Sequence, residues 1–223
     1  MFDRIAHRYD LVNHLLSFGQ DILWRRNVAR RLCRANKNSI LDVATGTADQ
    51  LIAFCRRHDS VHTAIGIDMS ALMLQHGRQK VKRCGQHQRI LLIHGDALAI
   101  PLQDRSVDAT TIVFGIRNVM DVPHALEEMH RVLKQGGHAI ILEFSLPENR
   151  FLRSLYLFYF RNILPRVGGL ISGDSYAYQY LNQTVETFPY GDNFITLMTA
   201  AGFARVTATP LTFGVATIYQ GEA

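Results

Sequence analysis

The stretch SILDVATGTAD at residues 39–49, followed by AIGID at residues 64–68, decides the fold. Residues 39–43 form a short apolar run typical of a buried strand, Gly46 marks a turn into a helix, and residues 63–67 are expected to form a second strand. A strand, a glycine-bearing turn, a helix and a second strand together make a unit that binds nucleosides at the carboxyl edge of a parallel sheet.

Strands and helices alternate over most of the remaining chain. Ser70 is placed to cap a helix that runs to about Cys84, and Asp121 with Pro123 opens another helix, which Gly136-Gly137 is expected to close. Further strands are expected at residues 89–93, 107–114, 139–144, 204–208 and 212–220. This alternation predicts an α/β fold: a Rossmann-like, doubly wound, mostly parallel seven-stranded sheet with helices on both faces.

The two quoted segments and the turn after the third strand supply the candidates for cofactor binding: Gly46, Thr47, Asp68, Asp96 and Ala97. Gly46 lets the backbone approach a ligand, Asp68 can accept hydrogen bonds from both ribose hydroxyls, and Asp96-Ala97 can receive an adenine edge. Each feature alone is common without a ligand, so the interpretation depends on their order and spacing. The loop lacks a full GxGxxG pattern, which favours S-adenosylmethionine over NAD.

Ala48 stands where nucleotide-binding loops frequently carry glycine. An alanine forced to positive φ costs roughly 1 kcal/mol, so we expect a helical conformation for Ala48. A positive φ at Ala48 would weaken cofactor binding.

The first 37 residues differ from the rest of the chain. Apolar residues between Leu15 and Leu32 recur at helical spacing, with a break at Ser17-Phe18-Gly19, and so predict two helices joined by a turn. We expect an N-terminal helical arm or lid at residues 1–37 and a methyltransferase domain at residues 38–223, with a substrate-side insertion around residues 150–190.

Charge is concentrated in the arm. The chain has 223 residues and a net charge of +5, and residues 1–37 account for this excess with eight Arg or Lys against three Asp. A basic helical arm suits an anionic membrane surface or a nucleic acid, and a solvated helix face has the same composition. The sequence has no apolar run near the roughly 18 residues that a membrane span needs, and no signal-peptide pattern, so we expect a cytoplasmic protein. Peripheral contact with the inner face of the membrane is an open alternative.

The three cysteines form no CxxC pair, which argues against a disulfide framework or a zinc site. The ten histidines show no clear ligand spacing, so we expect no metal site.

Three segments resemble a known family, the menaquinone and ubiquinone biosynthesis C-methyltransferases, which include demethylmenaquinone methyltransferase and are class I S-adenosylmethionine-dependent enzymes. The segments are FDRIAHRYDLVNHLLSFGQDILWRR at residues 2–26, FGIRNV at 114–119 and RVLKQGGHAIILEFS at 131–145. The first is similar to the family's YDxxNxxxS…W signature through Tyr9, Asp10, Asn13, Ser17 and Trp24. The chain departs from the family pattern at Asp21, often histidine, at Gln135, usually proline, and at Ala48, usually glycine.

The resemblance implies methyl transfer from S-adenosylmethionine to a ring carbon of a polyprenylated hydroquinone, with Thr47, Asp68, Asp96 and Ala97 at the family's cofactor contacts. Demethylmenaquinol, which would give menaquinol, is the first candidate acceptor. The second is 2-methoxy-6-polyprenyl-1,4-benzoquinol of ubiquinone biosynthesis. A homodimer stays open.

Arg117 and Asn118 follow the fourth strand at the cofactor's edge of the sheet. Arginine can stabilise a developing phenolate while asparagine orients the ring. Because arginine is too basic to accept a proton, we expect a water held between Arg117 and a neighbouring acid to act as the base. His14 is the other candidate base, since histidine titrates near neutral pH, and Asp10 is a further catalytic candidate beside it.

The resemblance implies that Tyr9 and Asn13 fold over the ring, with Asp10 and His14, as part of the lid. On the other interpretation, Asp10 and Asn13 cap the first helix and Tyr9 packs on the core. The aromatic stretch at residues 151–160 leaves a similar choice, because aromatic residues at helical spacing usually belong to a core. A polyprenyl tail needs an apolar groove and basic flanks suit anionic lipid, so we favour the groove.

Two rival functions remain. A methyltransferase acting on amino groups of nucleic-acid bases usually carries an Asn/Asp-Pro-Pro-aromatic turn after the fourth strand, whereas this chain has Phe114-Gly-Ile-Arg-Asn118, so we expect no nucleic-acid partner. A non-catalytic homologue that lost activity at Ala48 is the second rival, and the affinity for S-adenosylmethionine would test it.

Overall fold

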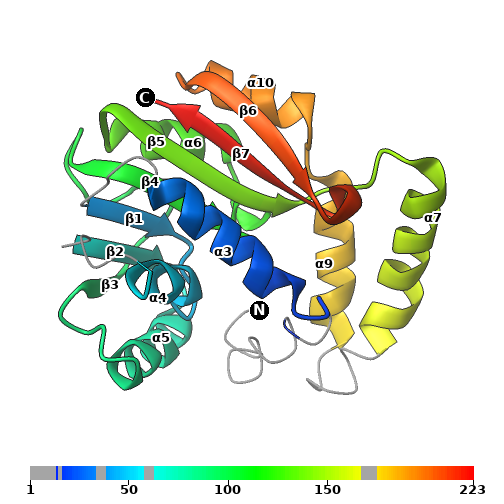
Figure 1. The fold of residues 1–223 in the computed structure, drawn as a ribbon, viewed down its shortest axis with the longest axis horizontal. Coiled ribbons are helices and arrows are strands. Elements are labelled where there is room, and N and C mark those ends of the chain that lie inside the picture. The colour runs from blue at the N-terminus through cyan, green and yellow to red at the C-terminus, as the bar shows by residue number, and fades with distance from the viewer. Residues whose placement is uncertain (1–13, 15–16, 34–38, 58–62, 167–174) are drawn as a thin grey trace.

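A seven-stranded sheet with the strand order β3-β2-β1-β4-β5-β7-β6 forms the centre of the molecule (Figure 1). The computed structural model describes residues 14, 17–33, 39–57, 63–166 and 175–223. Within these residues the strands are β1 Ser39–Val43, β2 Thr63–Asp68, β3 Ile90–His94, β4 Val107–Val113, β5 Leu133–Phe144, β6 Ala204–Leu211 and β7 Ala216–Glu222. The α-helices are α3 Gln20–Cys33, α4 Asp49–Cys55, α5 Ala71–Arg83, α6 Val122–Arg131, α7 Arg150–Phe158, α9 Ser175–Thr187 and α10 Asp192–Ala200.

The strand order places the ligand-binding edge. The strands from β1 to β5 pair in parallel, β1 lying between β2 and β4, while β7 is antiparallel to both β5 and β6. The chain therefore winds outward in two directions from β1 and β4, and open sheets of this kind bind ligands where the winding reverses. The expected doubly wound, mostly parallel sheet with a closing strand pair is confirmed.

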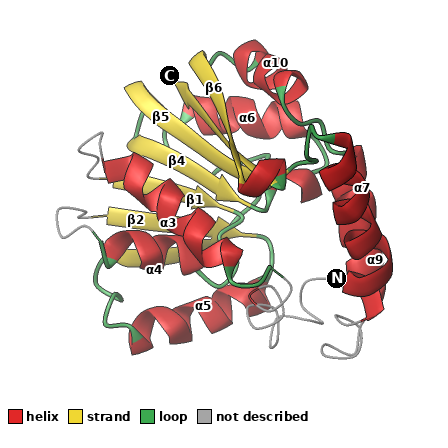
Figure 2. Ribbon diagram, turned by 45° about the vertical axis from the view of Figure 1, so that its right-hand side comes forward, coloured by secondary structure: helices red, strands yellow, loops and turns green. Residues whose placement is uncertain are grey.

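Helices cover both faces of the sheet (Figure 2). On one face Trp24 of α3, Phe54 of α4 and Leu74 of α5 pack on buried residues of the strands. On the other face Met129 of α6 and Phe194 of α10 do the same. The second half of the expected arm, α3, is thus part of the core.

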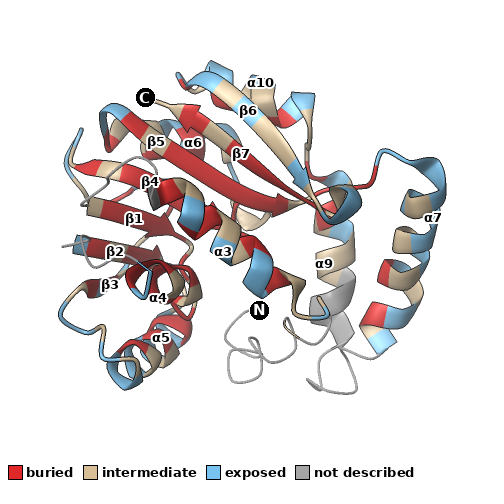
Figure 3. Ribbon diagram, in the orientation of Figure 1, coloured by how far each residue is buried: buried red, intermediate tan, exposed pale blue. Residues whose placement is uncertain are grey.

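α7 stands at the rim of the molecule, next to α9, and much of its surface faces outward (Figure 3). Phe151, Leu155 and Phe158 are exposed on it by 76%, 58% and 59%. Its other side leads into a small apolar cluster formed by Leu146, Phe160, Leu164 and Val185. The π-helical turn Tyr159–Ile163 continues α7. No described helix is both long and apolar enough to cross a bilayer.

Two expected helix starts are confirmed. The Ser70 side chain accepts a hydrogen bond from the Met73 backbone N–H, and the Asp121 side chain accepts one from His124. The inner face of α6 and the two residues just beyond the helix are buried: Ala125, Leu126, Met129, Val132 and Leu133.

The expectation that Gly136-Gly137 closes a helix is wrong. α6 ends at Arg131, and β5 begins two residues later and contains both glycines. The ladder to β4 jumps from Leu133 opposite Val107 to His138 opposite Ala109, so the glycines lie in a bulge. Gly136 has φ +71° and donates its N–H to the carbonyl of Ala223, which joins this bulge to the chain end.

Candidate active site

A pocket of about 430 Å³ opens at the carboxyl ends of β1, β2 and β4. A volume of this size suits a small-molecule ligand. All five residues expected to bind the cofactor line this pocket: Gly46, Thr47, Asp68, Asp96 and Ala97. Asn118 lines it as well.

The loop after β1 forms the floor of the pocket through an unusual backbone. Ala44, Gly46 and Ala48 have positive φ values of 51°, 56° and 67°. The expectation of a helical conformation for Ala48 is therefore wrong. Its N–H donates to the carbonyl of Thr45 while its own carbonyl accepts from Ile52, so it closes the loop and begins α4 in one step. These two bonds and the complete burial of Ala48 hold it in the left-handed region.

Asp68 is fixed at the end of β2 by two backbone donors. Its Oδ2 accepts the N–H of Gly46 and its Oδ1 accepts the N–H of Ser70, both at 2.8 Å. Because each carboxylate oxygen has a second lone pair, the group can still accept hydrogen bonds from a diol in the pocket.

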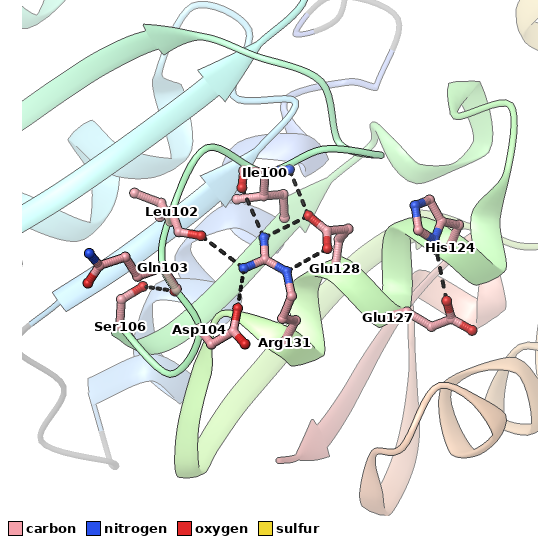
Figure 4. A network of polar contacts seen from close by, with 9 residues as sticks. All are labelled: Ile100, Leu102, Gln103, Asp104, Ser106, His124, Glu127, Glu128 and Arg131. Carbon is pink, nitrogen blue, oxygen red and sulfur yellow. Dashed lines mark hydrogen bonds and ion pairs between the residues drawn. The ribbon is translucent and has the colours of Figure 1, made fainter.

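The Asp96-Ala97 turn forms the β3 side of the pocket, and side chains of α6 bind the segment at residues 100–104 that comes shortly after this turn (Figure 4). Asp96 Oδ1 accepts the N–H of Leu98, and Glu128 of α6 accepts the N–H of Ile100. The Arg131 guanidinium donates to the carbonyls of Ile100 and Leu102. It also lies 2.6 Å from the carboxylates of Glu128 and Asp104. The hydrogen bond from Arg131 holds the pKa of Glu128 below its usual value.

Two carboxyls and a guanidinium, from Asp42, Asp49 and Arg25, lie on the β1 and α3 side of the pocket. Burial raises the pKa of Asp42 to about 6, although hydrogen bonds from Thr111 and Thr45 at 2.5 and 2.7 Å oppose the shift. Burial also acts to raise the pKa of Asp49, but Arg25 and Lys80 outweigh it and lower the pKa. Arg25 Nε is buried and has no hydrogen-bond partner among the described residues.

Lys80 of α5 ties two parts of this wall together. Its Nζ lies 2.6 Å from Asp49 Oδ1 and donates to Thr47 Oγ1 at 3.2 Å. The start of α4 and the loop after β1 are thereby held to α5.

Arg117 and Asn118 lie in a 3₁₀ turn at the end of β4, at the expected edge of the sheet. Arg117 is not among the described residues that line the pocket, because its guanidinium turns to Glu143 of β5 at 2.7 Å. Both side chains are almost completely buried, with exposures of 6% and 0%. The guanidinium also donates to the carbonyl of Phe114 and lies 5.3 Å from the centre of the Phe144 ring.

The arm contributes a separate polar group. His14 Nδ1 lies 2.5 Å from Asp21 Oδ2, and the Ser17 hydroxyl donates to Asp21 Oδ1 at 2.7 Å. His14 is also not among the residues that line the pocket. Tyr9, Asp10 and Asn13 lie outside the described residues, and so does the first helix expected in the arm.

Sequence reasoning missed four residues of this region: Arg25, Asp42, Asp49 and Glu143. Two of them carried a signal, since Asp42 and Glu143 are the ionisable residues within the apolar runs SILDV and AIILEF. An ionisable side chain inside a buried strand needs a partner or a function. Arg25 had no such signal, because it is one of a run of arginines.

Comparison with known proteins places the whole chain in one group. Residues 1–222 match the model of the ubiE/COQ5 methyltransferase family. The chain is 46% identical over 222 residues to the ubiquinone/menaquinone biosynthesis C-methyltransferase UbiE of Geotalea daltonii, covering 100% of this chain and 94% of the relative. It is 40% identical to the demethylmenaquinone methyltransferase of Bacteroides fragilis, covering 98% and 89% of the two chains.

A solved structure supports the fold. A SAM-dependent methyltransferase from Thermotoga maritima superposes with a TM-score of 0.67 and 17% identity, covering 100% of this chain and 99% of the other. At this identity the likeness concerns the fold alone, and it agrees with the doubly wound sheet.

Proposed function

The chain belongs to the ubiE/COQ5 methyltransferase family, and from this premise we propose that it methylates a ring carbon of a polyprenylated hydroquinone. It is an S-adenosylmethionine-dependent C-methyltransferase of quinone biosynthesis. Demethylmenaquinol is the proposed acceptor, and 2-methoxy-6-polyprenyl-1,4-benzoquinol is the second candidate. The observation that supports the proposal is that the residues expected to bind the nucleoside share one pocket with Asn118, and that Arg117, the residue before Asn118, forms a buried ion pair with Glu143.

The pocket fits S-adenosylmethionine by its chemistry. Arg25, with its unpartnered Nε, can bind the carboxylate of an amino acid, and Asp42 and Asp49 beside it can bind the ammonium group. Asp68 suits the ribose hydroxyls, and the Asp96-Ala97 turn suits the adenine edge. When bound, S-adenosylmethionine supplies an electrophilic methyl group.

The protein's own part in the reaction is to position the ring and remove a proton. A hydroquinone carbon becomes nucleophilic once a ring hydroxyl loses its proton, so no covalent enzyme intermediate is needed. After the methyl group is attached, the same carbon loses its own hydrogen as a proton and the ring regains its aromaticity. We assign Glu143 as the carboxylate that, together with Arg117, holds the water that takes the hydroxyl proton and passes it to Glu143. Asn118, on the pocket wall, orients the ring.

The arm has a secondary part in this proposal. His14 is the alternative base, with Asp10 beside it, and Tyr9 and Asn13 are proposed to close over the ring as a lid. The pairing of His14 Nδ1 with Asp21 leaves Nε2 able to accept a proton, so it is compatible with His14 as the base. We favour the water at Arg117 because Arg117 directly precedes Asn118, which lines the pocket, whereas His14 does not line it.

The lipid tail of the acceptor motivates a membrane contact. We propose that the exposed apolar side of α7, formed by Phe151, Leu155 and Phe158, rests on an anionic membrane; Arg150 and Arg153 are exposed elsewhere on the same helix. This placement would leave the inner side of α7 facing the active site.

A side-by-side assay tests the function. The enzyme is incubated with S-adenosylmethionine and, separately, with demethylmenaquinol or 2-methoxy-6-polyprenyl-1,4-benzoquinol, and products are identified by mass. We expect a ring-methylated product from demethylmenaquinol at the higher kcat/KM. A protein that binds S-adenosylmethionine by calorimetry and methylates neither quinol would contradict the proposal.

A further inference from the structure

Tyr156 is a half-buried residue of α7 whose hydroxyl is completely buried. Its ring stacks on Phe160 with centroids 5.1 Å apart. The hydroxyl has no hydrogen-bond partner among the described residues. Buried hydroxyls are nearly always paired, so an unpaired one calls for a ligand, a water or a functional role.

The surroundings of Tyr156 are those of the proposed acceptor site. Tyr156 and Phe144 pack on the same small apolar cluster, and Arg117, Tyr159 and Glu143 are the groups whose charge acts on the Tyr156 hydroxyl. A series of contacts leads from Tyr156 to Arg117: the Tyr156 ring stacks on Phe160, the Phe160 ring is 6.5 Å from that of Phe144, and the Phe144 ring is 5.3 Å from the Arg117 guanidinium. α7 and the turn after β4 therefore face one another across this aromatic layer.

Tyr156 is not alone in lacking a partner. Arg117 Nε and Asn118 Oδ1 are also buried without a hydrogen bond among the described residues. Two hydrogen-bond donors, the Tyr156 hydroxyl and Arg117 Nε, and one acceptor, Asn118 Oδ1, thus have no partner among the described residues in the region of the Arg117–Glu143 pair. Burial raises the pKa of Tyr156, so its hydroxyl stays protonated at neutral pH and can donate a hydrogen bond.

We propose that Tyr156 is a substrate-binding residue whose hydroxyl donates a hydrogen bond to a ring oxygen of the methyl acceptor. This inference rests on the proposed function, because it requires an acceptor with ring oxygens. A hydroquinone carries two oxygens on opposite sides of its ring, so one can meet Tyr156 while the other meets Asn118 and the Arg117 side. A phenolic donor also stabilises the negative charge that forms on the ring oxygen when its proton leaves.

The test compares Tyr156→Phe with the control Tyr190→Phe, which removes a hydroxyl from another half-buried tyrosine that packs on the same apolar cluster. Tyr156→Phe keeps the ring stacked on Phe160 and removes only the unpartnered oxygen. We expect an unchanged or higher melting temperature and an affinity for S-adenosylmethionine within twofold of the wild type by calorimetry. The kcat/KM for demethylmenaquinol should fall at least about tenfold, as the loss of a hydrogen bond to a developing charge implies. The control should stay within twofold.

A second measurement identifies the atom that is contacted. Two analogues, each lacking one ring oxygen, are used as competitive inhibitors of both enzymes. Tyr156→Phe should weaken the binding of the analogue that keeps the contacted oxygen and leave the binding of the other analogue unchanged. Equal effects on both analogues, or a kcat/KM within twofold of the wild type, would overturn the role of Tyr156. If the wild type methylates neither quinol, the proposed function itself fails, and the inference with it.

Discussion

At the scale of single residues, the site depends on two carboxyls that the fold buries in different ways. Asp42 of β1 is held by two threonine hydroxyls and has no cation in hydrogen-bond contact among the described residues. Glu143 of β5 is paired directly with Arg117. Neutralising Asp42 should therefore stabilise the ligand-free protein, whereas removing Arg117, the partner of Glu143, should destabilise it.

Asp42→Asn is expected to stabilise the ligand-free protein in a pH-dependent way. The folded state raises the pKa of Asp42 from 3.8 to about 6, so it favours the protonated form, and the wild type loses stability as pH rises through this range. The amide keeps contact with Thr45 and Thr111 without the charge. We expect a gain of about 3 kcal/mol in the free energy of unfolding at pH 8, about half of that at pH 5, and almost none below about pH 3.

Urea unfolding at several pH values measures this gain. Glu127→Gln, at a side chain that is 61% exposed, serves as the control and should change little. A gain that does not vary with pH would show that the buried charge of Asp42 is not its cause.

Arg117→Ala should destabilise the protein, because it leaves Glu143 as a buried carboxylate without its cation. The expected loss is about 3–5 kcal/mol. The double variant Arg117→Met with Glu143→Leu should recover most of this stability while turnover stays lost. Affinity for S-adenosylmethionine should change little, because neither residue lines the pocket. Turnover of the double variant near the wild-type rate would remove both residues from the proposed proton transfer.

At the scale of elements, the sequence pattern located the strands and the caps but not the backbone details. Apolar runs bounded by turn residues locate a strand, and Ser70 and Asp121 mark helix starts, because both signals are local. The positive φ of Ala48 depends on hydrogen bonds within the folded loop, and the bulge at Gly136 depends on a bond to Ala223, far along the chain. No local pattern contains these contacts. The same reason hid Arg25, which reaches the pocket only because α3 packs beside α4.

Arg131 is expected to control one wall of the pocket from a distance. It holds residues 100–104 to α6, and these residues directly follow the Asp96-Ala97 turn. Arg131→Met should lower the free energy of unfolding by about 1–2 kcal/mol, because several hydrogen bonds to a partly buried guanidinium are lost. The affinity for S-adenosylmethionine should fall a few-fold by calorimetry.

Arg205→Met is the matched control, since Arg205 is 80% exposed and pairs only with Glu222 among the described residues. This variant should lower the free energy of unfolding by less than about 0.5 kcal/mol and leave the affinity for S-adenosylmethionine unchanged. The contribution of the Arg131–Glu128 pair should disappear as pH falls through the lowered pKa of Glu128, where protonation removes its charge. Unchanged affinity in Arg131→Met would show that the turn holds its shape without α6.

At the scale of the whole molecule, two surfaces compete as the membrane contact. The excess positive charge of the sequence lies in residues 1–37. Of its four arginines on α3, Arg26 and Arg30 are exposed, whereas Arg25 lines the pocket and Arg31 binds the side chain of Gln220. Only two of the four described arginines of the arm are therefore exposed, and we favour the apolar side of α7 as the membrane contact.

Binding to lipid vesicles separates the two surfaces. The variant Phe151→Ser, Leu155→Ser, Phe158→Ser should lose most binding to both anionic and neutral vesicles, because inserted apolar side chains act regardless of lipid charge. The variant Arg26→Gln, Arg30→Gln should weaken binding to anionic vesicles alone, by about 1 kcal/mol for each charge, and this effect should shrink at high salt. Neither should lower the melting temperature, since the replaced side chains are exposed. If the α7 variant keeps its vesicle binding but sediments as a smaller species than the wild type, that side of α7 joins two copies of the chain, and the membrane contact must be sought on the arm.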